Sequence, residues 1–313
     1  MTMQNRICGR KAEYARGRFQ YVMLNTNGIR IAEDKEFVKD LSKFQGKFEI
    51  YLQFDSFNDE VYKAIRGREL AKIKEKAINN LKEYNIPVTL VMTLERNLND
   101  KEIGKVITYG LETSNIRGVN IQPVAYFGRK NGNIDRKNRV TLTDAIRLIE
   151  EQTKKMIAKE DFVPLPCNVE RVSLTYLYRT KNGFLPITRA NNIKKVLPYI
   201  NNTFTFKIED ALTNGRDIIF GSCCNPLIFL KEFKKFVPKD FMSWDLAKRS
   251  EYVSNNTFRI TISSFIDRYN FDIKSMQKEC VHIVTEDLKR IPFSSYNIIT
   301  TNCNFIFRFS SGF

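Results

Sequence analysis

Four short apolar segments, each followed directly by polar residues, constrain the fold of this chain more than any other feature. They are YVMLNTNG (Tyr21–Gly28), EIYLQFDS (Glu49–Ser56), VTLVMTLERN (Val88–Asn97) and GVNIQPV (Gly118–Val124). Stretches with helical periodicity separate them. Strand-like segments that alternate with helices predict an α/β fold with a parallel sheet or barrel. Because the strand interiors are apolar at successive positions, we expect burial on both faces of the sheet.

The helices between these strands carry recognisable boundaries. We expect the first helix at Asp34–Lys43. The second is indicated by an apolar stripe of Leu70, Ile73, Ala77, Ile78 and Leu81 and ends at Asn85 and Pro87. The third is expected at Lys101–Thr113, capped by Asn99 or Asp100, and the fourth at Asp144–Met156, opened by Thr141 or Thr143. After Asp161 the periodicity changes to short helices (Asn191–Ile200, Pro226–Phe236) and a strand-like segment, Thr257–Phe265. This pattern predicts an N-terminal segment (1–18), an α/β unit (19–160) and an α+β C-terminal extension (161–313).

Polar residues at the carboxyl ends of parallel strands face a shared pocket in folds of this class. The candidates are Asn25, Thr26 and Asn27 at the first strand end, Gln53 and Asp55 at the second, Thr93 at the third and Gln122 at the fourth. Such amides, hydroxyls and carboxylates suit hydrogen bonding to the ribose, amine and carboxylate of a small molecule. For any single strand end the alternative is an ordinary turn, since Asn and Gly tolerate positive φ. Four polar ends in register favour a binding pocket.

The formal net charge of +16 has two interpretations. One is a polyanionic partner, such as nucleic acid or an anionic lipid surface. The other is lysine spread over solvated surfaces. The predicted helix around residue 75 favours the second, because its lysines alternate with glutamates. These residues are Lys72, Lys74, Lys76 and Lys82 among Glu69, Glu75 and Glu83, which we interpret as a mixed-charge helix face. No nucleic-acid-binding motif accompanies the charge.

The number and spacing of the cysteine and histidine residues limit the kinds of metal or catalytic site that the chain can form. The six cysteines form no CxxC pair, and His282 is the sole histidine, so a Ser-His-Asp triad is excluded unless it includes that residue. The chain has no apolar stretch long enough to span a bilayer, and its first twenty residues lack the apolar core of a secretory signal. These features predict a cytoplasmic protein.

Several phrases, in order along the chain, resemble the radical SAM superfamily. They are LNTNGIRIA, YLQFDSFNDEVYKAIRGREL, VMTLERNLNDKEIG and RGVNIQPVAYFGR, followed by DFVPLPC, SSFIDRYNFD, ECVHIVTED and IPFSSYN. Within the superfamily they are similar to an archaeal branch that contains the hydroxymethyl-dihydropterin methyltransferase and the tetraether lipid synthase. The resemblance implies a partial radical-SAM-type (β/α) barrel that lacks its first strands. It also implies S-adenosylmethionine and a [4Fe–4S] cluster as cofactors, and alkylation of a pterin or coupling of lipid chains as the reaction.

The chain departs from that family in the residues that hold iron. The CxxxCxxC loop and the glycine-rich segment of the family are absent from these 313 residues. We therefore expect that the chain alone does not perform the radical reaction. Three interpretations stay open: a truncated gene product, half of a split enzyme that receives the cluster loop from a partner chain, or a pseudoenzyme. A non-catalytic basic protein that binds an anionic lipid or nucleic acid is the alternative from another class.

The resemblance also implies auxiliary metal ligands in the C-terminal part. Cys167 and Cys280 match cysteines of the family and are the candidate metal ligands. Family members show further cysteines where this chain has Glu279 and Ser294. With those partners replaced, ordinary small buried residues are the favoured interpretation of Cys167 and Cys280. For His282, a structural hydrogen-bonding role is favoured over iron ligation.

Overall fold

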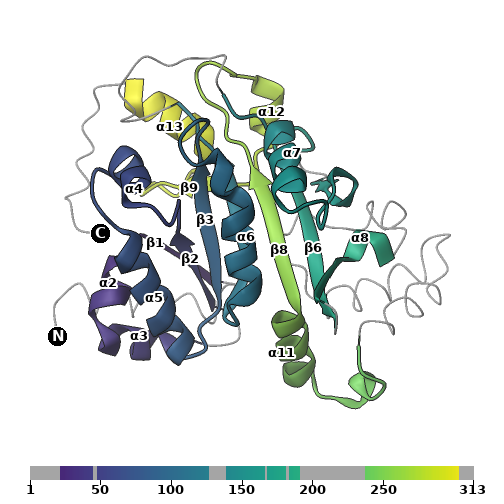
Figure 1. Ribbon diagram of the computed structural model, residues 1–313. Coiled ribbons are helices and arrows are strands. Elements are labelled where there is room, and N and C mark those ends of the chain that lie inside the picture. The colour runs from purple at the N-terminus through teal and green to yellow at the C-terminus, as the bar shows by residue number, and fades with distance from the viewer. Residues whose placement is uncertain are drawn as a thin grey trace.

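A mixed sheet forms the centre of the molecule (Figure 1). The structure, a computed structural model, describes residues 22–44, 48–126, 139–165, 168–180, 183–190 and 237–302. Within these residues the sheet has eight strands in the order β1-β2-β3-β4-β8-β6-β5, with β7 paired to β6. The strands are β1 (Val22–Thr26), β2 (Phe48–Gln53), β3 (Val88–Leu94), β4 (Ile116–Pro123), β5 (Val163–Pro164), β6 (Val172–Thr180), β7 (Gly183–Pro186) and β8 (Thr257–Ser263). Strands β1 to β4 and β8 are parallel, which confirms the predicted α/β class.

The helices of the N-terminal half pack on one face of this sheet. They are α2 (Ile29–Glu33), α3 (Lys35–Ser42), α4 (Asp59–Arg66), α5 (Ala71–Glu83), the short η1 (Asp100–Glu102), α6 (Ile103–Glu112) and α7 (Leu142–Gln152). Figure 1 shows α5 and α6 in front of the parallel strands. The expected helices are confirmed to within a few residues at each end. Asp34 caps α3, and Thr141 caps α7 in a capping box with Asp144.

The two faces of the sheet differ in chemistry. The face under the helices is apolar and carries the main core, to which Ile50, Leu90, Ile121 and Ile260 belong. Side chains alternate between the faces of a strand, so the intervening residues lie on the opposite face. Both faces are largely buried, as expected, but the second face is mostly polar. The interpretation of these strands as apolar throughout is therefore wrong for half of their positions.

The predicted strand near Thr257 is confirmed as β8, which joins the sheet beside β4. Gly118 of β4 pairs with Arg259 of β8, and a Cβ on Gly118 would lie 2.3 Å from the Arg259 carbonyl oxygen. Strand β6 pairs antiparallel with β8 and was not predicted. Residues beyond 161 thus contribute strands to the same sheet as residues before it. The domain boundary at residue 161 stays a prediction.

The remaining described elements belong to the C-terminal part of the chain. They are η3 (Lys159–Asp161), α8 (Ile187–Ala190), η6 (Phe241–Ser243), α11 (Leu246–Asn256), α12 (Ile273–Gln277), β9 (His282–Val284), β10 (Arg290–Pro292) and α13 (Phe293–Asn302). Figure 1 shows α12 and α13 at the same end as α4, and α11 at the opposite end. The helices expected at 191–200 and 226–236 lie outside the described residues. No helix in the described part of the chain is long and apolar enough to cross a membrane.

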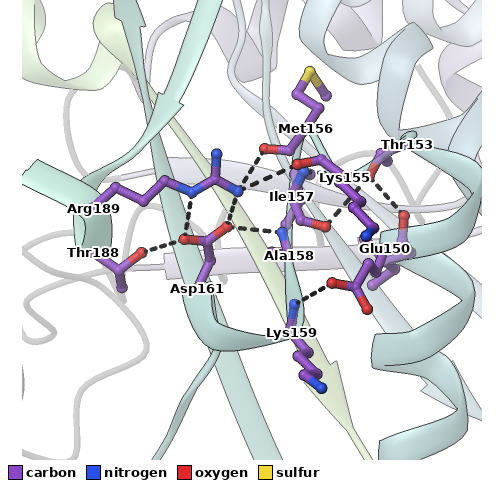
Figure 2. Close-up of polar contacts among 11 residues, drawn as sticks. Glu150, Thr153, Lys155, Met156, Ile157, Ala158, Lys159, Asp161, Thr188 and Arg189 are labelled. Atoms are coloured by element: carbon purple, nitrogen blue, oxygen red, sulfur yellow. Dashed lines mark hydrogen bonds and ion pairs between the residues drawn. The ribbon is translucent and has the colours of Figure 1, made fainter.

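A polar cluster fastens α8 to the end of α7 (Figure 2). The Asp161 carboxylate accepts hydrogen bonds from Arg189 Nε at 2.9 Å, the Thr188 hydroxyl at 3.0 Å and the Ala158 N–H at 2.8 Å. The Arg189 guanidinium also donates to the Met156 carbonyl at 3.2 Å. The carbonyls after a helix end need such partners. The cluster therefore ties the first segment of the C-terminal half to the last helix of the N-terminal half.

Candidate functional site

The face of the sheet opposite the helices carries polar side chains from five adjacent parallel strands. We call this surface the polar face. It consists of Asn25 on β1, Glu49, Tyr51 and Gln53 on β2, Thr89 and Thr93 on β3, Asn120 and Gln122 on β4, and Arg259, Thr261 and Ser263 on β8. The strand register aligns these residues in rows across the sheet. One row joins Asn25, Tyr51 and Thr89, and the next joins Gln53 to Asn120 and Thr261 through Val91.

Three of the predicted site residues lie at the end of β1. Asn25 is exposed and belongs to the polar face. Thr26 accepts a hydrogen bond from the Gly28 N–H at 3.1 Å, and Asn27 accepts one from the Ile29 N–H at 3.1 Å. The side chains of Thr26 and Asn27 thus close the turn into α2. The turn interpretation holds for these two residues, and the predicted contact of Asn25 with a ligand stays a prediction.

Asp55 and Thr93 lie next to each other at the ends of β2 and β3. The Asp55 carboxylate is fully buried and accepts hydrogen bonds from Arg66 Nε at 2.8 Å, Arg66 Nη2 at 3.0 Å and the Thr93 N–H at 2.9 Å. Arg66 also donates to the Thr93 hydroxyl at 2.9 Å. A bidentate charged pair of this kind is strong and directional. Asp55 and Thr93 therefore hold two strand ends together, and their predicted contact with a ligand stays a prediction.

Asn99 completes the same junction. Its side-chain amide donates to the Asp55 carbonyl at 2.9 Å and to the Thr93 carbonyl at 2.8 Å. Its amide oxygen accepts from the Glu95 N–H at 2.9 Å. The sequence predicted Asn99 as a helix cap, but its side chain makes no capping hydrogen bond. Its role is to bind the ends of two strands, which no local pattern reveals.

A buried ionic cluster lies deeper on the polar face. Glu49 on β2 and Arg259 on β8 approach to 3.9 Å, and Arg259 donates to the Thr89 hydroxyl at 3.4 Å. Thr89 in turn donates to the Glu49 carboxylate. Burial raises the pKa of Tyr51 beside them. Sequence analysis missed Glu49 and Arg259 because both lie inside apolar segments. For Glu49, the sequence signal was the alternation of Glu49, Tyr51 and Gln53 along one strand.

Among the described residues, the Thr261 hydroxyl on the polar face has no hydrogen-bond partner. Thr261 is buried, and its Oγ1 makes no hydrogen bond to any residue that the structure describes. It lies beside Asn120 on the neighbouring strand, which accepts a hydrogen bond from Ser263 at 3.3 Å. Buried hydroxyls are normally paired because an unpaired one costs free energy.

The predicted surface position of Lys74 on α5 is wrong. The sequence placed it on a mixed-charge, solvated helix face, but its side chain is fully buried. Its Nζ donates to the Asn27 carbonyl at 2.6 Å. Burial lowers the pKa of Lys74 to about 8, while the nearby Asp55 charge acts in the opposite direction. A buried ammonium group therefore lies directly behind the end of β1.

Comparison with known proteins defines the family. The family model of the radical SAM superfamily matches residues 5–109, a region that includes the ends of β1, β2 and β3. The 7,8-dihydro-6-hydroxymethylpterin dimethyltransferase of Methanocaldococcus jannaschii is 32% identical over 319 aligned positions, which cover 90% of this chain and 62% of that protein. The chain belongs to the radical SAM superfamily. A probable GTP 3',8-cyclase of Thermococcus kodakarensis is 33% identical over 93 positions, covering 30% of this chain and 29% of that relative.

The described residues do not fit the iron–sulfur cluster of the radical SAM superfamily. Nowhere in them do three histidine, cysteine, aspartate or glutamate side chains gather as a metal site. Cys280 lies beside the small apolar cluster of Leu165, Val172 and Leu174, and its sulfur is in a disulfide bond. Cys167 lies outside the described residues. Metal binding by Cys167 and Cys280 stays a prediction.

Proposed function

We propose that the polar face binds S-adenosylmethionine and that the chain takes part in methylation of a reduced pterin. Membership of the radical SAM superfamily supports the first part, and the activity of the methanogen relative supports the second. The chain spans 62% of the length of that relative, so the activity is a proposal for this protein. The observation that carries the binding proposal is the buried Thr261 hydroxyl among the amides of the polar face, which has no hydrogen-bond partner in the described part of the chain.

The side chains of the polar face supply complementary groups. Gln53, Asn120 and Gln122 carry amides that both donate and accept hydrogen bonds, as recognition of ribose hydroxyls, an amino group or the edge of a pteridine ring requires. Arg66 at the β2 and β3 ends is partly exposed, with its side chain 27% accessible. Its guanidinium offers a cation for the carboxylate of the ligand. These groups come from strands and a helix, which are rigid supports for a site.

The reaction needs one group that the described residues do not hold. A [4Fe–4S] cluster supplies the electron for cleavage of S-adenosylmethionine in this superfamily. We assign no step of that cleavage to residues of this chain. Anaerobic reconstitution with iron and sulfide separates binding from catalysis. Formation of 5′-deoxyadenosine together with a four-iron cluster would show that the chain alone performs the radical step.

Isothermal titration calorimetry tests the binding proposal directly. We expect wild type to bind S-adenosylmethionine and its stable analogue S-adenosylhomocysteine, and Asn120→Ala and Gln122→Ala to bind about tenfold more weakly, the loss expected for about one hydrogen bond. Asn80→Ala is the matched control, because Asn80 is a buried amide on the helix side of the sheet. Absence of binding by folded wild type would overturn the proposal. Equal weakening in all three variants would also contradict it.

A further inference from the structure

The end of β1 is tightly packed against α5. Gly28, which follows Asn27, has φ of 78°, and a Cβ on it would lie 2.5 Å from Leu52 of β2 and 3.4 Å from Ala77 of α5. The two side-chain hydrogen bonds of the turn are local, spanning two residues each. Lys74 adds a contact from a helix 47 residues further along the chain. The position of the turn relative to α5 is thus set by packing at Gly28 and by the Lys74 contact to Asn27.

We propose that Lys74 is a positioning residue of the candidate site, whose ammonium group fixes the Asn27 carbonyl and thereby holds Asn25 in place on the polar face. The inference rests on the proposed function, because it deepens the account of the same binding site. Lys74 is fully buried, so it acts through the β1 end and does not touch the ligand. A charged donor makes a stronger hydrogen bond than a neutral one. Loss of the charge therefore loosens the turn that carries Asn25.

Three groups face the Lys74 ammonium from the elements packed against it. Asp55 at the end of β2 favours the charged form, and Arg66 on α4 disfavours it. The Tyr62 ring of α4 lies 5.6 Å from Nζ. Desolvation is the largest influence and lowers the pKa of Lys74 to about 8. The charge that holds the Asn27 carbonyl is therefore lost in a mildly alkaline range, well below the range in which a solvated lysine titrates.

The test compares two variants, each of which removes side-chain contacts to a different part of the segment formed by the β1 turn and α2. Lys74→Met keeps the length of the side chain and removes the charge at the β1 end. Asn80→Ala removes the hydrogen bonds from Asn80 to the Ile31 and Ala32 carbonyls, at 2.8 and 3.3 Å, and leaves the β1 end intact. Binding of S-adenosylhomocysteine is measured by calorimetry from pH 6.5 to 9.5. Amide hydrogen exchange of residues 22–33 is measured over the same range without ligand.

At pH 7 we expect Lys74→Met to bind more weakly than wild type and Asn80→Ala. Between pH 7 and pH 9.5, the affinity of wild type and of Asn80→Ala should fall by about tenfold more than the affinity of Lys74→Met. The common titration of the ligand cancels in this comparison. The protection factors at Gly28 and Ile29, which correct for the base-catalysed intrinsic exchange rate, should fall with pH in wild type and be low at all pH values in Lys74→Met. Identical exchange at these two amides in wild type and Lys74→Met would overturn the inference. That readout needs no ligand, so failure of wild type to bind would overturn only the proposed function.

Discussion

The carboxylate of Glu279 holds Ser294 at the start of α13 through two hydrogen bonds. It accepts from the Ser294 hydroxyl at 2.6 Å and from the Ser294 N–H at 3.0 Å. The same hydroxyl accepts from the Ile266 N–H at 3.0 Å, and Ser294 is fully buried. Glu279 and Ser294 are among the positions where the family resemblance implies further cysteines, as is the segment around Val172. They lie in contact, as ligands of one site would, but here an oxygen-based pair fastens α13 to the segment between α12 and β9. The Ile266 contact of the same hydroxyl fastens it to the loop after β8.

Ser294→Ala should lower the free energy of unfolding by about 1–3 kcal/mol, because it leaves a carboxylate and a buried N–H without their shared partner. Urea denaturation monitored by circular dichroism measures this. Ser243→Ala is the control, since Ser243 is exposed and bonds only a nearby carbonyl, that of Asp240. An unchanged unfolding midpoint in Ser294→Ala would show that the pair does not fasten α13.

Arg189→Ala should lower the free energy of unfolding by about 2 kcal/mol, a value reduced for the partial exposure of Arg189. The change leaves Asp161 buried with only the Thr188 hydroxyl and the Ala158 N–H as partners. Thermal unfolding measures the loss. Lys159→Ala tests an exposed pair in the same segment, in which Lys159 and Glu160 approach to 3.7 Å, and should have no measurable effect. Equal effects of the two variants would contradict the account of the cluster in Figure 2.

Gly118→Ala should be strongly destabilising, by about 3 kcal/mol or more, because the new methyl group meets the backbone of β8 and forces β4 and β8 apart. Gly67→Ala is a useful contrast. Gly67 has φ of 74°, but no atom lies within 4 Å of the position that a Cβ would take, so its cost is limited to about 1 kcal/mol of backbone strain. Chemical denaturation of both variants gives the comparison. The proposed close approach of β4 and β8 would be wrong if Gly118→Ala were the milder change.

Sequence patterns predicted the elements whose signals are local. The strands β1 to β4 and the helices α5 and α7 follow from apolar periodicity and from caps such as Thr141. Strand β6 escaped prediction, because its polar-apolar pattern acquires meaning only beside β8, about 80 residues away. The same holds for the place of β8 itself, which inserts next to β4 across more than 130 residues of chain.

The candidate site was predicted in outline only. The polar ends of the strands were identified because Asn, Gln and Asp stand out after apolar segments. The separate roles of these residues were not predicted, because they depend on partners far away in the sequence. Arg66 forms an ion pair with Asp55, and Asn99 joins two strand ends. Lys74 was misplaced on the surface because its helix position alone does not show that the β1 turn covers it.

Thr261→Val should stabilise the ligand-free protein by about 1 kcal/mol, because it removes a buried hydroxyl that has no partner among the residues the structure describes. It should also weaken binding of S-adenosylhomocysteine. Thr175→Val is the matched control. Thr175 carries a second buried, unpaired hydroxyl and pairs with Ile260, on the helix side of the sheet. Both variants should raise the unfolding midpoint, and only Thr261→Val should change the affinity. Unchanged affinity in Thr261→Val would remove the observation on which the binding proposal depends.

The titration of Lys74 also predicts how stability changes with pH. The folded chain holds the pKa of Lys74 at about 8, whereas a lysine in the unfolded chain titrates near pH ~10.4. Between these values the unfolded chain binds more protons, so the free energy of unfolding of wild type should rise with pH, and below pH 8 Lys74 adds no slope. The full rise is on the order of 3 kcal/mol.

Lys74→Met lacks this titration, so the difference in stability between wild type and Lys74→Met should shift in favour of wild type from pH 8 to pH 10.5. Urea denaturation of both proteins across that range measures the shift, and all other titrations cancel in the difference. Parallel stability curves would show that Lys74 keeps a normal pKa in the folded chain. The proposed loss of affinity over the same range has the opposite sign, because binding requires the charged form of Lys74 and folding favours the neutral form.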